Sequence, residues 1–227
     1  MKKVAVIVAG GSGKRMESSI PKQFLLLQNK PLLWHSVRAF IQAFSDIEIV
    51  IVLPENFIEE GKNIVQDFQA THKIDFIVGG NTRFQSVKNG LSLIKEECII
   101  FVHDAVRCLV TKNLITRCYQ QALAKTCAIP AVAATDTMRL IDGEKNILLN
   151  RNNVRIIQTP QTFQSKILLP AFQQQYRDSF TDEANVVETF GRKIFLIEGE
   201  TENIKITRPI DLLVAEKMLE LKLFPKH

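Results

Sequence analysis

A run of six small or β-branched apolar residues, residues 4–9, opens directly into a glycine-rich loop, Gly-Gly-Ser-Gly, at residues 10–13. The run has the composition and length of a buried strand in a parallel sheet. Because glycines lack side chains, the backbone N–H groups of the loop can turn towards a bound anion. This junction predicts an α/β protein with an anion site at the end of its first strand.

Three cations follow the glycines: Lys14 and Arg15 lie on the loop, and Lys22 comes seven residues after Arg15. A Walker loop ending at Lys14 would need a glycine where Val8 stands. The dinucleotide fingerprint would need a third glycine where Met16 stands. An ordinary strand-to-helix turn with solvated lysines needs no such cluster of cations. The loop therefore predicts a ligand that carries phosphates and is bound in neither of the two familiar ways.

The composition is that of a globular protein with a mild positive charge. Of 227 residues, 46% are apolar and 23% are charged, and the net charge is +5. Lysine and arginine are scattered, without a dense block or interleaved aromatic residues, which favours anionic small molecules over nucleic acid as partners. No apolar segment approaches the ~18 residues needed to cross a bilayer, so no membrane partner is expected.

The cysteines and the N-terminus indicate a cytoplasmic protein. Cys98, Cys108, Cys118 and Cys127 stand nine or ten residues apart with no C-x-x-C pair, which fits neither a zinc site nor a compact disulfide scaffold. Reduced thiols are expected. The lysines at positions 2–3 precede an apolar run that is too short for a signal peptide.

Strand-like and helix-like patterns alternate along the chain, which is the rhythm of a βαβ fold. Apolar runs predict strands at residues 4–9, 48–53, 73–78, 98–103, 128–134 and 193–197. Helical spacing predicts helices at residues 31–44, 57–70, 112–125, 165–176 and 210–223, one that ends near residue 95, and one capped by Thr181 that runs to residue 190. The sequence therefore predicts a single α/β domain over residues 1–227, with a Rossmann-like, doubly wound, mostly parallel sheet.

The βαβ rhythm breaks at residues 137–155. Two short apolar stretches, residues 137–140 and 147–149, flank a polar turn at residues 142–146, which is typical of a β-hairpin. A hairpin of two strands is not stable by itself in water. The insertion is therefore predicted to be a protruding β-arm that packs on a partner.

Two charged residues far from the loop are placed to join the anion site. Asp104 follows the strand at residues 98–103, so in a doubly wound sheet it faces the same crevice as the glycines. It is either a helix cap or a partner for Mg²⁺ or a cationic side chain, and the nearby phosphate site favours the second reading. Lys205 alternates with Ile204 and Ile206, so on an extended segment its amine points away from both. It is either solvated or held towards the site.

Eight motifs occur in one order along the chain: AGGSGKRM with PKQ, GGNTRFQSV, HDAVR, TDTMR, RNN, QTPQTF, TDEA and NIKITRPIDL. This set resembles the 2-C-methyl-D-erythritol 4-phosphate cytidylyltransferase family, which has a fold of the nucleotide-diphospho-sugar transferase type. The similarity runs from residue 4 to about residue 216. It implies an enzyme of the non-mevalonate isoprenoid pathway that uses CTP, a sugar-alcohol phosphate and Mg²⁺, and releases pyrophosphate. It also implies a homodimer in which the β-arm hooks around the second subunit.

The resemblance also implies roles for individual residues. It implies that Arg15 and Lys22 stabilise the transition state at the α-phosphorus, and that Arg151 and Lys205 position the acceptor phosphate. The implied substrate-binding residues are Ala9, Gly10, Gly11, Gly13, Lys14, Gly80, Asn81, Arg83, Ser86, Asp104, Ala105, Arg107, Thr137 and Thr159. Mg²⁺ is expected mainly on the CTP phosphates, with Asp104 as its protein ligand. Thr137 and Arg151 are expected to serve the partner's site, and Cys108 stands where the family usually has proline.

Three other functions are open to such a chain. Ribitol 5-phosphate cytidylyltransferase resembles it in HDAVR, QTPQTF and NIKIT, but residues 136–139, 181–184 and 208–209 are nearer the methylerythritol pattern. A CTP-binding regulatory module without turnover has no use for four transition-state cations. A nucleic-acid binder needs a basic patch or stacking aromatic residues, which the sequence lacks.

Overall fold

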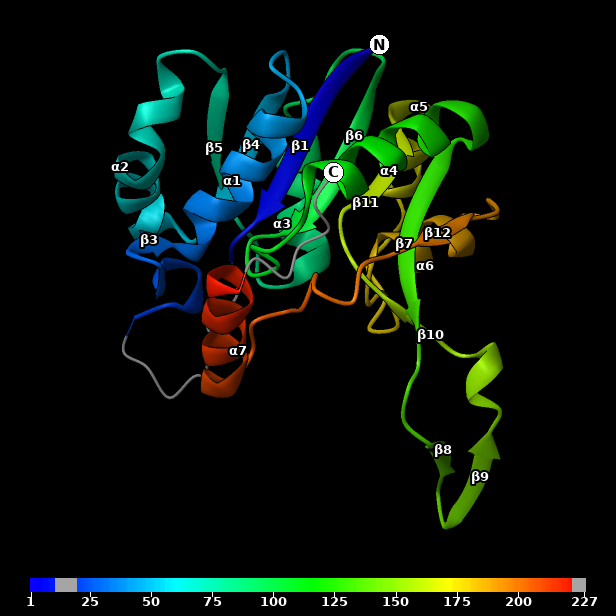
Figure 1. The fold of residues 1–227 in the computed structure, drawn as a ribbon. Helices are drawn as coiled ribbons and strands as arrows, with labels where there is room; N and C mark the ends of the chain where they lie inside the picture. Colours follow the sequence, from blue (N-terminus) through cyan, green and yellow to red (C-terminus); the bar gives the residue numbers. More distant parts are fainter. Residues whose placement is uncertain (11–19, 222–227) are drawn as a thin grey trace.

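The computed structural model describes residues 1–10 and 20–221 of the chain (Figure 1). Its main strands are β1 (Lys2–Val8), β4 (Glu48–Leu53), β5 (Ile74–Val78), β6 (Cys98–Asp104), β7 (Cys127–Ala133), β10 (Arg155–Ile157), β11 (Gln161–Gln164) and β12 (Leu196–Glu198). Over the described residues they form an eight-stranded sheet in the order β10-β7-β11-β6-β1-β4-β5, with β12 beside β7. Two short pairs lie apart from it: β2 (Leu26–Leu27) with β3 (Lys30–Pro31), and β8 (Met138–Asp142) with β9 (Lys145–Leu149).

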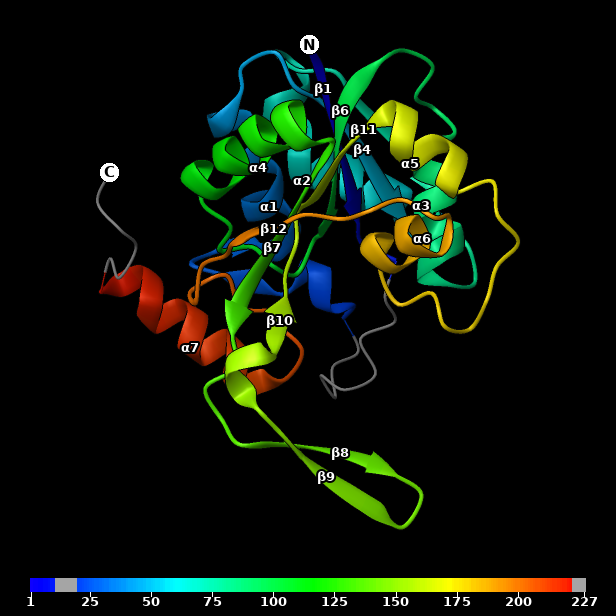
Figure 2. The same ribbon diagram turned by 90° about the vertical axis from the view of Figure 1, so that its right-hand side faces the viewer.

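Helices cover both faces of the sheet, as Figures 1 and 2 show. One face packs against α1 (Leu32–Ala43), α2 (Ile58–Gln69) and α4 (Lys112–Lys125), and the other against α3 (Arg83–Leu91), α5 (Ser165–Ala171) and α6 (Glu183–Thr189). Residues on β1 alternate between the two cores, because Ala5 and Ile7 pack on one face and Val4 and Val6 on the other. The predicted doubly wound arrangement is confirmed.

Four further elements complete the described part of the chain. They are the last helix, α7 (Pro209–Glu220), and the 3₁₀ turns η2 (Lys22–Phe24), η3 (Glu55–Phe57) and η4 (Arg151–Asn153). Helix α7 contacts β2 and buries Ala215 in a small third core with Leu27 and Ile206. Cys108 packs in this third core, where burial raises the pKa of its thiol to about 12. All four cysteines are buried free thiols.

The order of the parallel strands determines where a ligand can bind. Strand β1 is parallel to both β4 and β6, and Val8 at its end is paired in register with Asp104 at the end of β6. The chain moves outward from β1 to β4 and β5, then returns to form β6 on the other side of β1. Open α/β sheets bind ligands at the carboxyl ends of the strands beside such a reversal. The fold therefore places a crevice between the ends of β1 and β6.

The sheet is mixed beyond β6. Strand β11 is antiparallel to both of its neighbours, β6 and β7, and β10 is antiparallel to β7. No strand is predicted at Gln161–Gln164, because four residues with two glutamines lack the apolar pattern of a central strand. All four are buried nevertheless, and Gln164 donates through Nε2 to the carbonyl of Ala122 at 2.9 Å.

The predicted hairpin is confirmed as an arm of β8 and β9 that projects from the body of the protein (Figures 1 and 2). It carries large apolar side chains that are half or more exposed: Leu140, Ile141, Ile147 and Leu148. Leu140 and Ile147 are directly paired across the hairpin. Apolar side chains that a projecting element leaves exposed are typical of protein interaction surfaces.

Three predicted helix boundaries need correction. Helix α3 ends at Leu91, four residues before the predicted end, and α5 ends at Ala171, where Pro170 removes a backbone donor from its last turn. Helix α6 is capped by Asp182 and not by Thr181, since the N–H of Asn185 donates to Asp182 Oδ1 at 2.8 Å. Of the helices in residues 1–10 and 20–221, none is long and apolar enough to cross a membrane.

Candidate functional site

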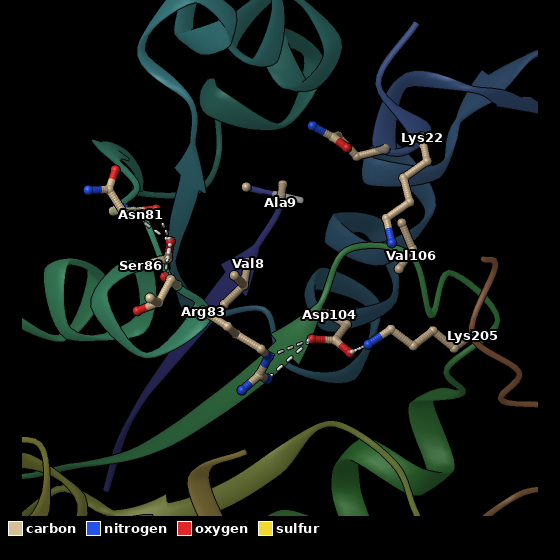
Figure 3. Close-up of a pocket in the computed structure, with 13 residues that line it drawn as sticks. Val8, Ala9, Lys22, Asn81, Arg83, Ser86, Asp104, Val106 and Lys205 are labelled. Atoms are coloured by element: carbon tan, nitrogen blue, oxygen red, sulfur yellow. Dashed lines mark hydrogen bonds and ion pairs between the residues drawn. The ribbon is translucent and has the colours of Figure 1, made fainter. Parts of the chain in front are cut away.

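A cavity of about 390 Å³ lies at the carboxyl ends of β1 and β6 (Figure 3). Its described lining residues come from five separate segments of the chain. They are Val8, Ala9 and Gly10 after β1, Lys22 and Gln23 on η2, Gly80, Asn81, Thr82, Arg83 and Ser86 around the start of α3, Asp104 and Val106 after β6, and Lys205. The cavity therefore occupies the crevice that the strand order predicts.

The start of α3 forms one side of the cavity. Ser86 Oγ accepts a hydrogen bond from the N–H of Gly80 at 3.1 Å and donates to the carbonyl of Thr82 at 3.0 Å. Thr82 caps the helix by accepting from the N–H of Gln85. A β-carbon on Gly80 would lie 2.5 Å from the β-carbon of Gln85, so no side chain fits there without a shift of the turn. This turn brings the backbone close to any ligand in the cavity.

Asp104 lies between two cations in the cavity, as the dashed lines in Figure 3 show. Its Oδ1 accepts from Arg83 Nη2 at 3.2 Å and from Arg83 Nε at 3.3 Å, and its Oδ2 lies 2.7 Å from Lys205 Nζ. Burial by itself would raise the pKa of this carboxyl, but the charges of Arg83 and Lys205 outweigh burial and hold the pKa of Asp104 well below its usual range. Asp104 is therefore ionised and pairs with cationic side chains, one of the two roles predicted for it.

The other edge of the Arg83 guanidinium contacts Glu183 at the start of α6. Arg83 Nη1 donates to Glu183 Oε1 at 2.5 Å, and Nη2 donates to Oε2 at 3.1 Å. The Glu183 side chain is 1% exposed. Burial raises the pKa of Glu183, although the charge of Arg83 opposes that shift. Burial would lower the pKa of Arg83, but Glu183 and Asp104 raise it above the ordinary value.

Lys205 is held in place by its neighbours. Ile206 is fully buried and its N–H donates to the carbonyl of Val106 at 2.9 Å, while Ile204 packs on the same small core. The Lys205 side chain lies on the cavity side and is 38% exposed. The predicted alternation of this segment is confirmed, and of the two fates predicted for Lys205, the structure supports the one in which the amine is held towards the site.

A network of buried groups stabilises the end of β6. Thr159 Oγ1 accepts from the N–H of Asp104 at 3.1 Å and lies 3.0 Å from His103 Nδ1. Burial lowers the pKa of His103 to about 3, so its ring is neutral. Arg107 donates to the backbone carbonyls of Asn203, at 2.8 Å, and Ile157, at 3.3 Å. These contacts tie the strand end to the segment that carries Lys205.

The arm residues lie apart from this cavity. Thr137 and Arg151 line a second hollow at the base of the arm, together with Leu148 and Asn152. Arg151 Nη1 donates to the backbone carbonyl of Thr135 at 2.8 Å. Within one chain, the structure does not bring Arg151 or Thr137 to Lys22 and Lys205.

The predicted site residues therefore fall into four groups. Those that line the cavity are Ala9, Gly10, Lys22, Gly80, Asn81, Arg83, Ser86, Asp104 and Lys205. Ala105, Arg107 and Thr159 are not among the described lining residues; Thr159 and Arg107 brace the wall, and the carbonyl of Ala105 accepts from Ser36 Oγ. Thr137 and Arg151 lie on the arm, while Gly11, Gly13, Lys14 and Arg15 lie outside the described residues.

Two residues of the site were not predicted. Gln23 lines the cavity at 1% exposure, and neither atom of its side-chain amide has a hydrogen-bond partner among the described residues. A buried amide without partners is unfavourable, so Gln23 is a candidate contact for a ligand in the cavity. Glu183 carries a detectable signal, since it shares the apolar helical spacing of Val186 and Val187 and is still a carboxylate.

The described residues form no metal site by themselves. No group of three or more histidine, cysteine, aspartate or glutamate side chains within them is arranged to hold a metal ion. Asp104 is the one carboxylate among the described residues that line the cavity, and both of its oxygens already contact cations. Within the described residues, Asp104 is therefore the one carboxylate of the cavity lining that could contact a divalent ion.

A doubly wound sheet with a cation-lined cavity at its reversal point is typical of nucleotide-binding α/β enzymes. The family model for 2-C-methyl-D-erythritol 4-phosphate cytidylyltransferase matches residues 3–221. The chain belongs to that family, and it is a nucleotidyltransferase.

Individual relatives agree with the family model over nearly the full length. The chain is 41% identical to the 2-C-methyl-D-erythritol 4-phosphate cytidylyltransferase of Phocaeicola vulgatus, over 96% of this chain and 100% of the relative. It is 44% identical to that of Azobacteroides pseudotrichonymphae, over 96% and 99%. Among solved structures, the enzyme of Francisella tularensis superposes with a TM-score of 0.79 at 32% identity, over 96% of this chain and 99% of the other. The 4-diphosphocytidyl-2C-methyl-D-erythritol synthase of Anaerococcus prevotii superposes with a TM-score of 0.83 at 26% identity, over 96% of each chain.

Proposed function

We propose that this chain joins CTP to 2-C-methyl-D-erythritol 4-phosphate and releases pyrophosphate, with the cavity at β1 and β6 as the reaction site. One observation carries the proposal. Lys22 and Lys205, which are 183 positions apart in the sequence, line the same cavity as the glycine-rich end of β1 and the turn before α3. Cations gathered from distant segments suit a reaction at a phosphorus atom.

The cavity has two chemically different sides that suit the two ends of CTP. In Figure 3, Asn81 and Ser86 lie on one side, and Lys22 and Lys205 lie on the other. We infer that the cytosine base lies against the backbone turn that Ser86 holds, and that the phosphates extend towards Lys22. The glycine loop that is predicted to wrap the triphosphate begins at Gly10, and its remaining residues lie outside the described part of the chain.

The reaction needs alignment and charge stabilisation more than proton transfer. A phosphate oxygen of the acceptor attacks the α-phosphorus in line with the bond to the β-phosphate. That bond breaks and pyrophosphate leaves with the electron pair. The attacking phosphate monoester needs no general base, because its second pKa of ~6 leaves it largely ionised at neutral pH. Lys22 stabilises the charge that builds on the non-bridging oxygens, and Lys205 positions the acceptor phosphate.

We further propose that Mg²⁺ binds mainly through the CTP phosphates. The donor set supports this, because Asp104 contributes the one described carboxylate in the cavity wall. When bound, the ion neutralises charge on the phosphates and on the leaving pyrophosphate. Asp104 is ionised, and it becomes a protein ligand of the ion only where one of its oxygens exchanges Arg83 or Lys205 for the metal.

We also propose a homodimer in which each arm completes the other subunit's site. The exposed apolar residues Leu140, Ile141 and Leu148 support a protein partner for the arm. Arg151 and Thr137 lie at the base of the same arm and away from their own chain's cavity, which supports their use in a partner's cavity. Four buried thiols without disulfides support a cytoplasmic location.

The proposed function predicts a strong preference between two acceptors. With CTP and Mg²⁺, 2-C-methyl-D-erythritol 4-phosphate is expected to give one pyrophosphate per acceptor consumed, and ribitol 5-phosphate is expected to react at least about tenfold more slowly in kcat/KM. A coupled pyrophosphate assay measures both, with a reaction lacking acceptor as the control. Equal or faster reaction with ribitol 5-phosphate would assign the other acceptor, and CTP binding without pyrophosphate from either would indicate a regulatory module.

A further inference from the structure

Four charged side chains of alternating sign form a continuous row that begins outside the cavity and ends inside it. They are Glu183 on α6, Arg83 on α3, Asp104 at the end of β6 and Lys205. Each contacts the next through hydrogen bonds or ion pairs of 2.5 to 3.3 Å. The row therefore links α6 to a cation that lines the cavity.

The planar shape of the Arg83 guanidinium determines which of its atoms face Glu183 and which face Asp104. Glu183 takes the edge of Arg83 formed by Nη1 and Nη2, with one carboxylate oxygen on each nitrogen. The edge formed by Nε and Nη2 is then directed at one oxygen of Asp104, Oδ1. Because Oδ1 is occupied in this way, Oδ2 is the oxygen that Asp104 presents to Lys205. Two-point contacts of this kind fix orientation as well as distance.

Glu183 is buried and set apart from the described cavity lining. Its side chain is 1% exposed, and it is not among the described residues that line the cavity. Packing of α6 does not call for a carboxylate, since its other inward residues are Ala184, Val186 and Val187. Burial of a charged group is unfavourable unless a partner compensates for it, and here the partner is Arg83. The place of this carboxylate is therefore explained by its contact with the guanidinium.

We propose that Glu183 is a positioning residue for the acceptor side of the reaction. It orients Arg83, Arg83 orients Asp104, and Asp104 sets the place of the Lys205 ammonium. Without Glu183, Arg83 interacts with Asp104 alone, and its whole positive charge acts on that carboxylate. The ion pair between Asp104 and Lys205 is then weaker. This inference rests on the proposed role of Lys205 in positioning the acceptor phosphate.

A purely structural role for Glu183, in which it only anchors α6 to α3, predicts a different pattern of effects. A structural defect would lower activity by the same factor whether Lys205 is present or absent. A residue that acts through Lys205 has little left to lose once Lys205 has been removed. A double-mutant cycle separates the two because coupled residues give non-additive effects.

The test measures kcat/KM for the acceptor, at saturating CTP, in the wild type, Glu183→Gln, Lys205→Ala and the double variant. We expect Glu183→Gln to lower kcat/KM at least about tenfold in the wild-type background and by less than about threefold in the Lys205→Ala background. Equal losses in both backgrounds, or no loss in the first, would overturn the proposal. The exposed Glu188→Gln on the same helix is the matched control and should leave kcat/KM unchanged.

A conservative variant protects the test against a failure to fold. Glu183→Asp keeps the charge but withdraws the carboxylate by one methylene group, and it is expected to retain more acceptor kcat/KM than Glu183→Gln. If thermal unfolding shows that Glu183→Gln does not fold, the same cycle is run with Glu183→Asp and is judged by the same coupling. The cycle uses whichever acceptor the wild type turns over. A wrong acceptor assignment would therefore show in the wild-type activity with each acceptor. A wrong role for Glu183 would show as additive losses in the double-mutant cycle.

Discussion

Replacing Lys22 with alanine is expected to lower kcat for cytidylyl transfer by about 10²- to 10³-fold, because one well-placed charge at a developing oxyanion contributes ~3–4 kcal/mol to transition-state stabilisation. Lys22 lies on η2 and lines the cavity. The fold should survive the change, since η2 is anchored by Phe24, whose ring lies 5.3 Å from that of Phe57. Pyrophosphate release at saturating substrates measures kcat, and thermal unfolding measures the fold.

A matched control tests whether the position of the lost lysine charge matters, and not only the loss of one positive charge. Lys62 is a half-exposed lysine on α2 that is not among the described residues lining the cavity, and it forms an ion pair with Glu59. Lys62→Ala removes the same charge from the protein and should leave kcat within about twofold of wild type. Turnover of Lys22→Ala close to that of Lys62→Ala would show that Lys22 does not act on the transition state.

Mixed dimers are expected to recover activity that neither parent variant has. Lys22→Ala and Arg151→Ala homodimers should both be nearly inactive. If Arg151 serves the neighbouring subunit, a dimer of one Lys22→Ala chain and one Arg151→Ala chain contains one site with both defects and one intact site. Tandem purification with two different tags isolates this hybrid, and it should show about half the wild-type turnover per dimer.

The opposite arrangement gives a distinct result. If Arg151 serves its own chain, each subunit of the hybrid carries one defect and the hybrid is as inactive as its parents. The structure favours the first outcome, because Arg151 and Lys22 line separate hollows of the same chain. A hybrid of Lys62→Ala with wild type, purified in the same way, should show full activity.

Much of the fold follows from local patterns. Helix α4 has the predicted bounds, Lys112–Lys125, because a capping threonine, Thr111, precedes a clear apolar stripe. Strand β4 has the predicted bounds as well, since Glu48–Leu53 is a compact apolar run. The meeting of Gly10 and Asp104 at one cavity could also be predicted, because parallel strands on either side of a reversal end at the same crevice.

Other features depend on contacts that no local pattern records. Strand β11 forms because its residues are buried between β6 and β7, and its own sequence has no apolar strand pattern. The contact of Glu183 with Arg83 joins residues 100 positions apart, and the helical spacing that predicts an inward-facing Glu183 does not predict which cation it meets. The proposed partner of the arm is a second subunit, and the local pattern around Thr137 and Arg151 predicts a hairpin but not what it contacts.

The most direct test of the proposed site is a crystal structure of the protein with CTP and Mg²⁺. We expect the cytosine against Gly80 and Ser86, and an α-phosphate oxygen within about 3 Å of Lys22 Nζ, a normal distance for a charged hydrogen bond. The triphosphate should lie on the side of the cavity that Lys22 and Lys205 share. CTP bound at another surface, or bound here with its base beside Lys22 and Lys205, would contradict the assignment.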